Sequence, residues 1–164
     1  MNLIPAEYYT NIYYQFLLLM MLFVIIQGGI KLEASQNLNV KKALGFFIFI
    51  IILFYMGLRP LNYRFGDMII YDRQFQTYAS GAPLKIEKDA LFEYFKFSTA
   101  QVATSSVFFF LFLILYLVPL YLACKKFFKD YWFYGFFMLV ISFSFWTYGT
   151  NGLRNGIATS LFLY

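Results

Sequence analysis

The chain has 164 residues, of which 62% are hydrophobic, 24% aromatic and only 13% charged. Because soluble domains carry about 25% charged residues, this composition excludes a soluble globular domain and predicts an integral membrane protein. The sequence contains no histidine, the commonest general base and metal ligand, and we expect no cofactor and no bound metal. The net charge of +5 indicates basic cytoplasmic loops, so we expect no nucleic-acid partner.

Four apolar segments are predicted to cross the membrane, and they cover residues 13–30, 43–58, 99–124 and 131–148. The second segment is short, and it reaches full length only if residues 38–40 join it or if its flanking lysines snorkel. The third segment is expected to begin with a capping box, in which Ser98 precedes Gln101 at the third helical position. A kink is expected at Pro119, late in the same segment.

The fourth apolar segment has tryptophans near its ends, and a fifth segment is incomplete. Trp132 and Trp146 lie near the ends of the fourth segment, where aromatic residues at the membrane surfaces are expected. A fifth apolar segment begins near Asn155 and stops at Tyr164, which is too short for a bilayer that needs about 20 residues. We therefore expect an N-terminal fragment of a longer protein, with a natural four-helix protein ending in a hydrophobic tail as the alternative. Residues 1–164 are expected to form one all-α, polytopic membrane domain with four full helices and the start of a fifth.

The basic residues predict the orientation. The loops after the first and third segments each contain three lysines and one carboxylate, and short net-basic loops lie in the cytoplasm. The N-terminus, which carries Glu7 and neither lysine nor arginine, is then outside. A long loop at residues 59–97 and a Gly/Asn-rich break at residues 149–156 are expected on that same outer face. The residues of the two basic loops are Lys31, Glu33, Lys41, Lys42, Lys125, Lys126, Lys129 and Asp130.

Arg154 lies in the Gly/Asn-rich break between two apolar segments. A fixed positive charge at the mouth of a membrane helix is costly unless it has a partner or an aqueous cavity. An arginine beside a helix N-terminus is suited to bind phosphate or carboxylate. The alternative interpretation is an arginine that snorkels to the membrane surface.

The long outer loop gathers arginine, aspartate and tyrosine. Arg59 and Arg64 begin it, a glycine that allows a sharp turn precedes Asp67, and Tyr71 follows. Such a cluster suits an anionic, hydroxyl-rich ligand, because arginine binds phosphate with two donors and a carboxylate can accept a proton from a sugar hydroxyl. The alternative is that the arginines and aspartates of this loop pair with each other in solvent, which contributes about 0–1 kcal/mol. Residues 87–97 are expected to form a helix, which either lies in the membrane interface or leads into the third segment.

The order of these motifs resembles the EpsG family, polytopic proteins of bacterial capsule and exopolysaccharide clusters that are similar in character to Wzy-type polymerases. The resemblance is carried by Gly57-Leu-Arg59, by Gly66-Asp67 with the nearby Tyr71, and by the Arg-Asn-Gly-Ile-Ala run at residues 154–158. The family typically has Gly-x-Asp where this chain has no intervening residue, and glutamine where this chain has Asn155.

The resemblance implies a membrane glycosyltransferase that polymerises oligosaccharide repeat units linked to polyprenyl diphosphate, on the outer side of the bacterial inner (cytoplasmic) membrane. A lipid diphosphate leaving group requires fixed positive charge, for which Arg154 is the first candidate, Arg59 the second and Arg64 the third. Asp67 is expected to act as the base for the acceptor hydroxyl. Tyr71 is expected to stack on a sugar ring or to donate a hydrogen bond.

Further candidates are Asn155 for substrate binding, and Glu7 and Glu87 as alternative bases. The expected partners are the lipid-linked oligosaccharide, the lipid bilayer and other polysaccharide-assembly proteins. Two other functional classes stay open. One is a flippase or transporter for the same lipid-linked sugar, and the other is a non-catalytic membrane subunit of a polysaccharide synthase complex.

Overall fold

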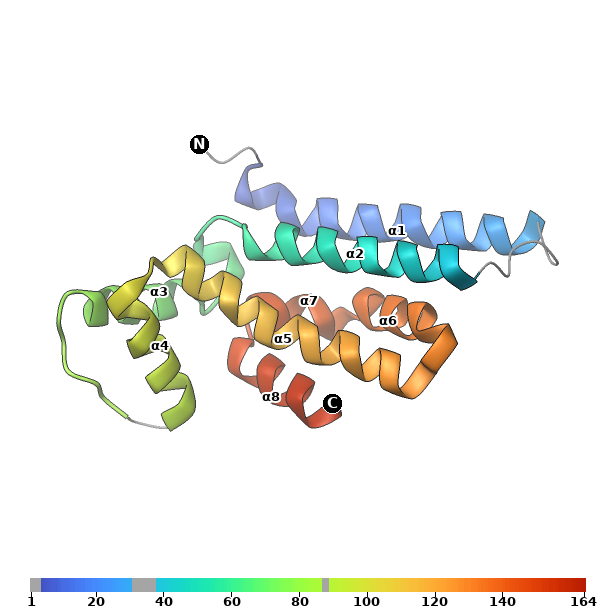
Figure 1. Cartoon of the computed structure of the whole chain (residues 1–164). Helices are drawn as coiled ribbons and strands as arrows, with labels where there is room; N and C mark the ends of the chain where they lie inside the picture. Colours follow the sequence, from blue (N-terminus) through green and yellow to red (C-terminus); the bar gives the residue numbers. More distant parts are fainter. Residues whose placement is uncertain (1–3, 31–37, 87–88) are drawn as a thin grey trace.

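The computed structural model describes residues 4–30, 38–86 and 89–164, and the regular elements of this part of the chain are all helical. They follow each other as α1 (Ala6–Ile30), α2 (Leu38–Gly57), η2 (Tyr63–Phe65), α3 (Met68–Ala79), α4 (Ala90–Val102), α5 (Ser105–Phe128), η3 (Lys129–Tyr131), α6 (Trp132–Ile141), α7 (Phe143–Thr150) and α8 (Leu153–Leu163). Helices α1 and α2 lie along one side of α5, while α3 and α4 form a separate pair at one end of the molecule (Figure 1).

Three helical runs are long and apolar enough to cross a membrane: Ala6–Ile26, Leu38–Gly57 and Ser105–Ile141. The third run comprises α5 and α6, which η3 joins so that α6 packs back along α5 (Figure 1). In such apolar segments, a helix satisfies every backbone polar group internally, which is what a bilayer requires. The chain therefore has the helices of a multi-pass membrane protein.

The first two helices begin earlier than the apolar segments suggest. Helix α1 starts at Ala6, where the preceding Pro5 accepts a hydrogen bond at its carbonyl from the backbone N–H of Tyr8. Helix α2 starts at Leu38, so residues 38–40 do join the second segment, which confirms one of the two predicted alternatives.

The predicted start of the third segment is wrong. Helix α4 continues through Ser98 and Gln101 and ends only at Val102, and α5 starts after an extended Thr104. Within α4 the hydroxyl of Thr99 donates to the carbonyl oxygen of Phe95 at 2.7 Å, so it bonds back to the preceding turn and does not mark a helix start. Pro119 lies inside α5, which continues as one helix from Ser105 to Phe128.

The fourth predicted segment is broken at Ser142, whose backbone is extended, into the short helices α6 and α7. The break frees the carbonyl of Val140, and Tyr13 from α1 donates its hydroxyl to this oxygen at 2.7 Å. The ring of Tyr13 also packs on Trp146, with centroids 4.4 Å apart. Both Trp132 and Trp146 are buried against other helices, so they pack inside the helical core. A broken helix is tolerated here because a neighbouring side chain satisfies the freed backbone group.

Helix α5 is the centre of the packing, and it contacts α2, α6 and α8. Its buried face includes Phe108, Phe112 and Leu117, which pack in one core with Phe136 of α6. At the C-terminal end of α5, Lys42 of α2 forms an ion pair with Asp130 at 2.6 Å, so the start of α2 and the α5–α6 turn share one end of the molecule.

Candidate functional site

A sharp turn between η2 and α3 fixes the start of the site. Gly66 has a φ of +60°, as the predicted glycine turn requires, and a Cβ there would lie 2.0 Å from Oδ1 of Asn151. That Asn151 oxygen accepts a hydrogen bond of 2.9 Å from the backbone N–H of Asp67. The turn therefore ties the N-terminal end of α3 to the segment between α7 and α8.

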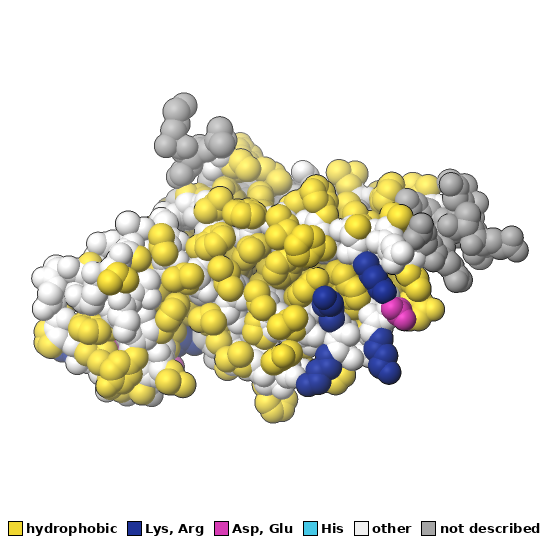
Figure 2. All heavy atoms as spheres, in the orientation of Figure 1, with side chains coloured by type: hydrophobic (Ala, Val, Ile, Leu, Met, Phe, Trp, Pro, Cys, Tyr) yellow, Lys and Arg dark blue, Asp and Glu magenta, His cyan; other side chains and the backbone are white. Residues whose placement is uncertain are grey.

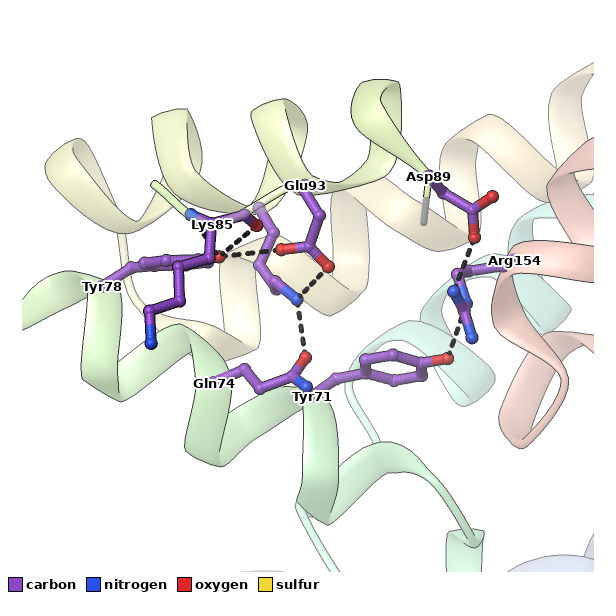
Figure 3. A network of polar contacts seen from close by, with 8 residues as sticks. Tyr71, Gln74, Tyr78, Lys85, Asp89, Glu93 and Arg154 are labelled. Carbon is purple, nitrogen blue, oxygen red and sulfur yellow. Dashed lines mark hydrogen bonds and ion pairs between the residues drawn. The ribbon is translucent and has the colours of Figure 1, made fainter. Parts of the chain in front are cut away.

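Arg154 lies in the first turn of α8 and contacts two other elements (Figure 3). Its Nε donates to the hydroxyl of Tyr71 at 3.1 Å, and its Nη1 donates to Oδ2 of Asp89 at 2.5 Å. The guanidinium also lies 6.0 Å and 5.9 Å from the ring centroids of Tyr71 and Phe92. Arg154 is thus held by α3 and by the start of α4, although 39% of its side chain remains exposed.

These contacts affect the acid–base behaviour of Arg154. Partial burial alone would lower the pKa of the guanidinium. The hydrogen bonds and charge interactions with Tyr71 and Asp89 outweigh the burial, so the pKa of Arg154 is raised above its ordinary value. Arg154 is a permanent cation at physiological pH.

A second cation lies next to the first. Lys96 of α4 is only 1% exposed, and its Nζ contacts Oε1 of Glu93 at 2.8 Å and Oε1 of Gln74 at 2.6 Å. The other carboxylate oxygen of Glu93 accepts a hydrogen bond of 2.9 Å from the hydroxyl of Tyr78 (Figure 3). Because a buried charge requires an ion pair and hydrogen bonds, the cluster satisfies Lys96 internally.

Lys96 and Arg154 share two aromatic rings. The Nζ of Lys96 lies 5.9 Å from the ring centroid of Tyr71 and 5.2 Å from that of Phe92. Each cation is matched by its own carboxylate, so the cluster is formally neutral. We call this group the two-cation cluster, and its members are Tyr71, Gln74, Tyr78, Asp89, Phe92, Glu93, Lys96 and Arg154.

A groove beside Arg154 combines polar and apolar walls. It has a volume of about 430 Å³ and lies between α4, α5 and α8. Asp89, Arg154 and Asn155 line it, together with apolar side chains such as Phe92 and Leu115. A groove of this composition fits an amphiphile that has an anionic head and an apolar tail.

A second cavity, of about 440 Å³, lies on the Glu93 side of the two-cation cluster. Its walls are more polar, and they include Gln74, Thr77, Tyr78 and Lys85 besides Glu93. Amide, hydroxyl and carboxylate groups around one cavity can hydrogen-bond a hydroxyl-rich ligand.

Two of the predicted site residues, Tyr71 and Arg154, are in direct contact, and Asn155 lines the groove. In contrast, no contact of Arg59, Arg64 or Asp67 with Arg154 is found among the described residues. Asp67 is exposed, and its side chain makes no cap hydrogen bond to α3. Glu87 lies outside the residues that the structure describes.

The other two arginines have separate environments. Arg64 is half-exposed and lies 4.0 Å from the carboxylate of Glu7. Arg59 is 5% exposed, donates through Nη1 to the carbonyl of Met56 at 2.5 Å and lies 5.6 Å from the ring of Phe65. Burial lowers the pKa of Arg59 to about 10, so the group is still charged at neutral pH. In the described part of the chain, the arginines and aspartates of residues 59–73 do not form the mutual ion pairs that the alternative interpretation expected.

Sequence reasoning missed Asp89, Glu93, Lys96 and Asn151. A signal for the ion pair is present, because Glu93 and Lys96 are three residues apart, which places them on one face of a helix. No comparable signal exists for Asp89 and Asn151, whose partners are 65 and 84 residues away in the sequence.

No protein-family model, no curated protein and no solved structure matches this chain.

Proposed function

We propose that this chain belongs to a membrane glycosyltransferase of the EpsG type, which polymerises polyprenyl-diphosphate-linked oligosaccharides for a bacterial capsule or exopolysaccharide. The observation that carries the proposal is the position of Arg154, a partly exposed guanidinium beside an apolar groove. A ligand with a diphosphate head and a polyprenyl tail complements both features.

The donor is proposed to bind with its diphosphate on Arg154 and the first part of its tail in the groove. Arginine can bind phosphate with two parallel donors, but Asp89 occupies Nη1 of Arg154 in the free protein. The diphosphate would replace Asp89 at this nitrogen, while the hydroxyl of Tyr71 keeps Nε in place. A cation fixed in this way stabilises the negative charge that develops on the leaving group.

In the proposed reaction, an acceptor hydroxyl oxygen attacks the anomeric carbon of the donor sugar. The bond from that carbon to the diphosphate oxygen breaks, and polyprenyl diphosphate leaves with the electron pair. The hydroxyl proton passes to a carboxylate. Asp67 was the expected base, but Asp89 contacts Arg154 directly and becomes free when the diphosphate replaces it. We therefore propose Asp89 as the base, with Asp67 as the alternative.

The side of the membrane is proposed from the lysines at the other end of the molecule. Net-basic ends face the cytoplasm, so the two-cation cluster would face outward, and the protein would be a multi-pass component of the bacterial inner membrane with its N-terminus outside. Lipid-linked repeat units are available for polymerisation on that side.

Substitution of Arg154 in cells tests the proposal. In an Arg154→Ala strain we expect long polysaccharide chains to disappear while single lipid-linked units accumulate outside, because the leaving group is no longer stabilised. Arg73→Ala is the matched control, since it removes an exposed arginine of α3 that lies outside the two-cation cluster, and chain length should be normal. Normal chain length in Arg154→Ala would contradict the polymerase proposal and favour a scaffolding subunit. Units trapped inside would favour a flippase.

A further inference from the structure

A cluster of lysines occupies the end of the molecule opposite the two-cation cluster. Basic side chains gather near the α5–α6 turn, with acidic side-chain atoms among them (Figure 2). Two lysines come from the start of α2, two from the last turn of α5 and one from η3. They are Lys41, Lys42, Lys125, Lys126 and Lys129, and the acidic residue is Asp130.

Three of these lysines surround a pocket of about 590 Å³. Lys42 is neutralised by Asp130 at 2.6 Å. Lys125 lies 5.3 Å from the ring centroid of Tyr121, and neither Lys125 nor Lys129 forms an ion pair within the described ranges. The pocket therefore has an excess of positive charge that the described residues do not compensate.

The remaining walls of the pocket are aromatic. Phe46 of α2, Tyr121 of α5 and Trp132 of α6 line it together with the lysines. Phe46 is exposed on the apolar surface of α2, one of the helices long enough to cross a membrane. The pocket thus opens next to a surface that acyl chains can cover.

We propose that this pocket binds the phosphate headgroup of an anionic membrane lipid. Basic pockets between membrane helices recognise such headgroups, and lysines at helix ends lie at headgroup level. In this assignment Lys125 and Lys129 contact the phosphate, and the aromatic wall borders the upper part of the acyl chains. A lipid is favoured over soluble phosphate because apolar walls adjoin the cations. The site is independent of the proposed polymerase activity.

Trp132 provides a reporter inside the pocket. The chain has two tryptophans, so Trp146→Phe leaves Trp132 as the sole one. The Trp146→Phe variant is reconstituted in bilayers that contain brominated phosphatidylglycerol or, at the same fraction, brominated phosphatidylcholine. We expect stronger quenching of Trp132 by the anionic lipid than by phosphatidylcholine. This preference for the anionic lipid should fall roughly 30-fold in Lys125→Gln/Lys129→Gln, because each of the two lysines contributes roughly fivefold to anionic-lipid binding.

Two further variants make the result specific. Lys41→Gln/Lys126→Gln removes the same charge at the same end, but neither residue lines the pocket, so the preference should persist. Lys125→Arg/Lys129→Arg keeps the charge and should also keep the preference. Equal losses in both glutamine pairs would show a diffuse surface potential and overturn the site, as would equal quenching by both lipids before substitution. Displacement of the lipid by inorganic phosphate would contradict the lipid assignment.

Discussion

At the scale of single residues, Lys96 and Arg154 show how two cations can lie close together in one cluster. Both lie near the rings of Tyr71 and Phe92, and each has a carboxylate within 2.8 Å. Their exposure differs. Lys96 is fully buried and serves the packing of α3 on α4, whereas Arg154 retains access to a ligand.

Lys96→Met is expected to destabilise the protein by about 3–5 kcal/mol, because it leaves the carboxylate of Glu93 without its buried partner. The double substitution Lys96→Met/Glu93→Gln should lose less than the sum of the single effects. The free energy of unfolding of the purified protein in detergent measures this coupling. Lys85→Met, at an exposed lysine, serves as the control and should change the value by less than about 0.5 kcal/mol. Strict additivity of the two single effects would contradict the buried pair.

Arg59 is the predicted site residue whose environment differs most from that of Arg154. It follows an apolar segment, as a ligand-binding arginine would, but its side chain folds back onto the carbonyl of Met56 in the last turn of α2. A cation there interacts favourably with the helix C-terminus. A local motif cannot distinguish this role from ligand binding, because the difference depends on packing against Phe65.

At the scale of helices, the sequence predicted where apolar segments lie better than where they break. The cores of α1, α2 and α5 follow from uninterrupted apolar runs. The breaks at Ala103–Thr104 and at Ser142 occur in stretches with no strong local signal, and the second depends on Tyr13, which is 127 residues from Val140. Such a contact cannot be read from local sequence.

Tyr13→Phe tests the support of the α6–α7 break. The substitution keeps the ring against Trp146 but removes the hydroxyl that bonds to the carbonyl of Val140, so a buried acceptor loses its partner. We expect a loss of about 1–3 kcal/mol in unfolding free energy. Tyr14→Phe, at the adjacent and more exposed ring, should change it much less. Similar effects of the two substitutions would exclude a specific role for the hydroxyl.

Gly66→Ala tests the turn that aligns α3 with α8. An alanine at a φ of +60° is strained, and its Cβ would collide with Asn151, so we expect a loss of more than about 1–2 kcal/mol. Gly81→Ala separates the two causes, since Gly81 also has a positive φ but nothing lies within 4 Å of its Cβ position. Thermal unfolding should therefore show the larger decrease for Gly66→Ala. An equal decrease would mean that the contact with Asn151 is unimportant.

At the scale of the whole molecule, charged residues form two clusters, the two-cation cluster at one end and the lysines at the other. The sequence predicted which segments share an end: residues 59–97 and the Arg154 break meet through Asp89, and the basic segments meet through Lys42 and Asp130. Charge counts suffice for this grouping because short net-basic loops collect on one side of a membrane protein. The members of the two-cation cluster depend on helix packing and could only partly be predicted, with Tyr71 and Arg154 found and Lys96 missed.

Thiol labelling tests the proposed orientation of these ends. In a Cys124→Ser background, Leu91→Cys on α4 should react in intact cells with a membrane-impermeant maleimide, because Leu91 is 88% exposed and is proposed to face outward. Lys129→Cys, in the basic end, should react only after the membrane is permeabilised. The reverse labelling pattern would mean that the topology is opposite to the proposed one, and it would exclude an outward-facing two-cation cluster.

The central claim is that Arg154 binds a lipid diphosphate, and an equilibrium binding measurement tests it most directly. The purified protein is titrated with a polyprenyl diphosphate that carries no sugar, and with the corresponding polyprenol. We predict that Arg154→Ala raises the Kd for the diphosphate by about 30-fold or more, as loss of a charge-assisted contact worth at least about 2 kcal/mol implies. The Kd for the polyprenol, and both values in Arg73→Ala, should stay unchanged. An unchanged Kd for the diphosphate in Arg154→Ala would contradict the claim.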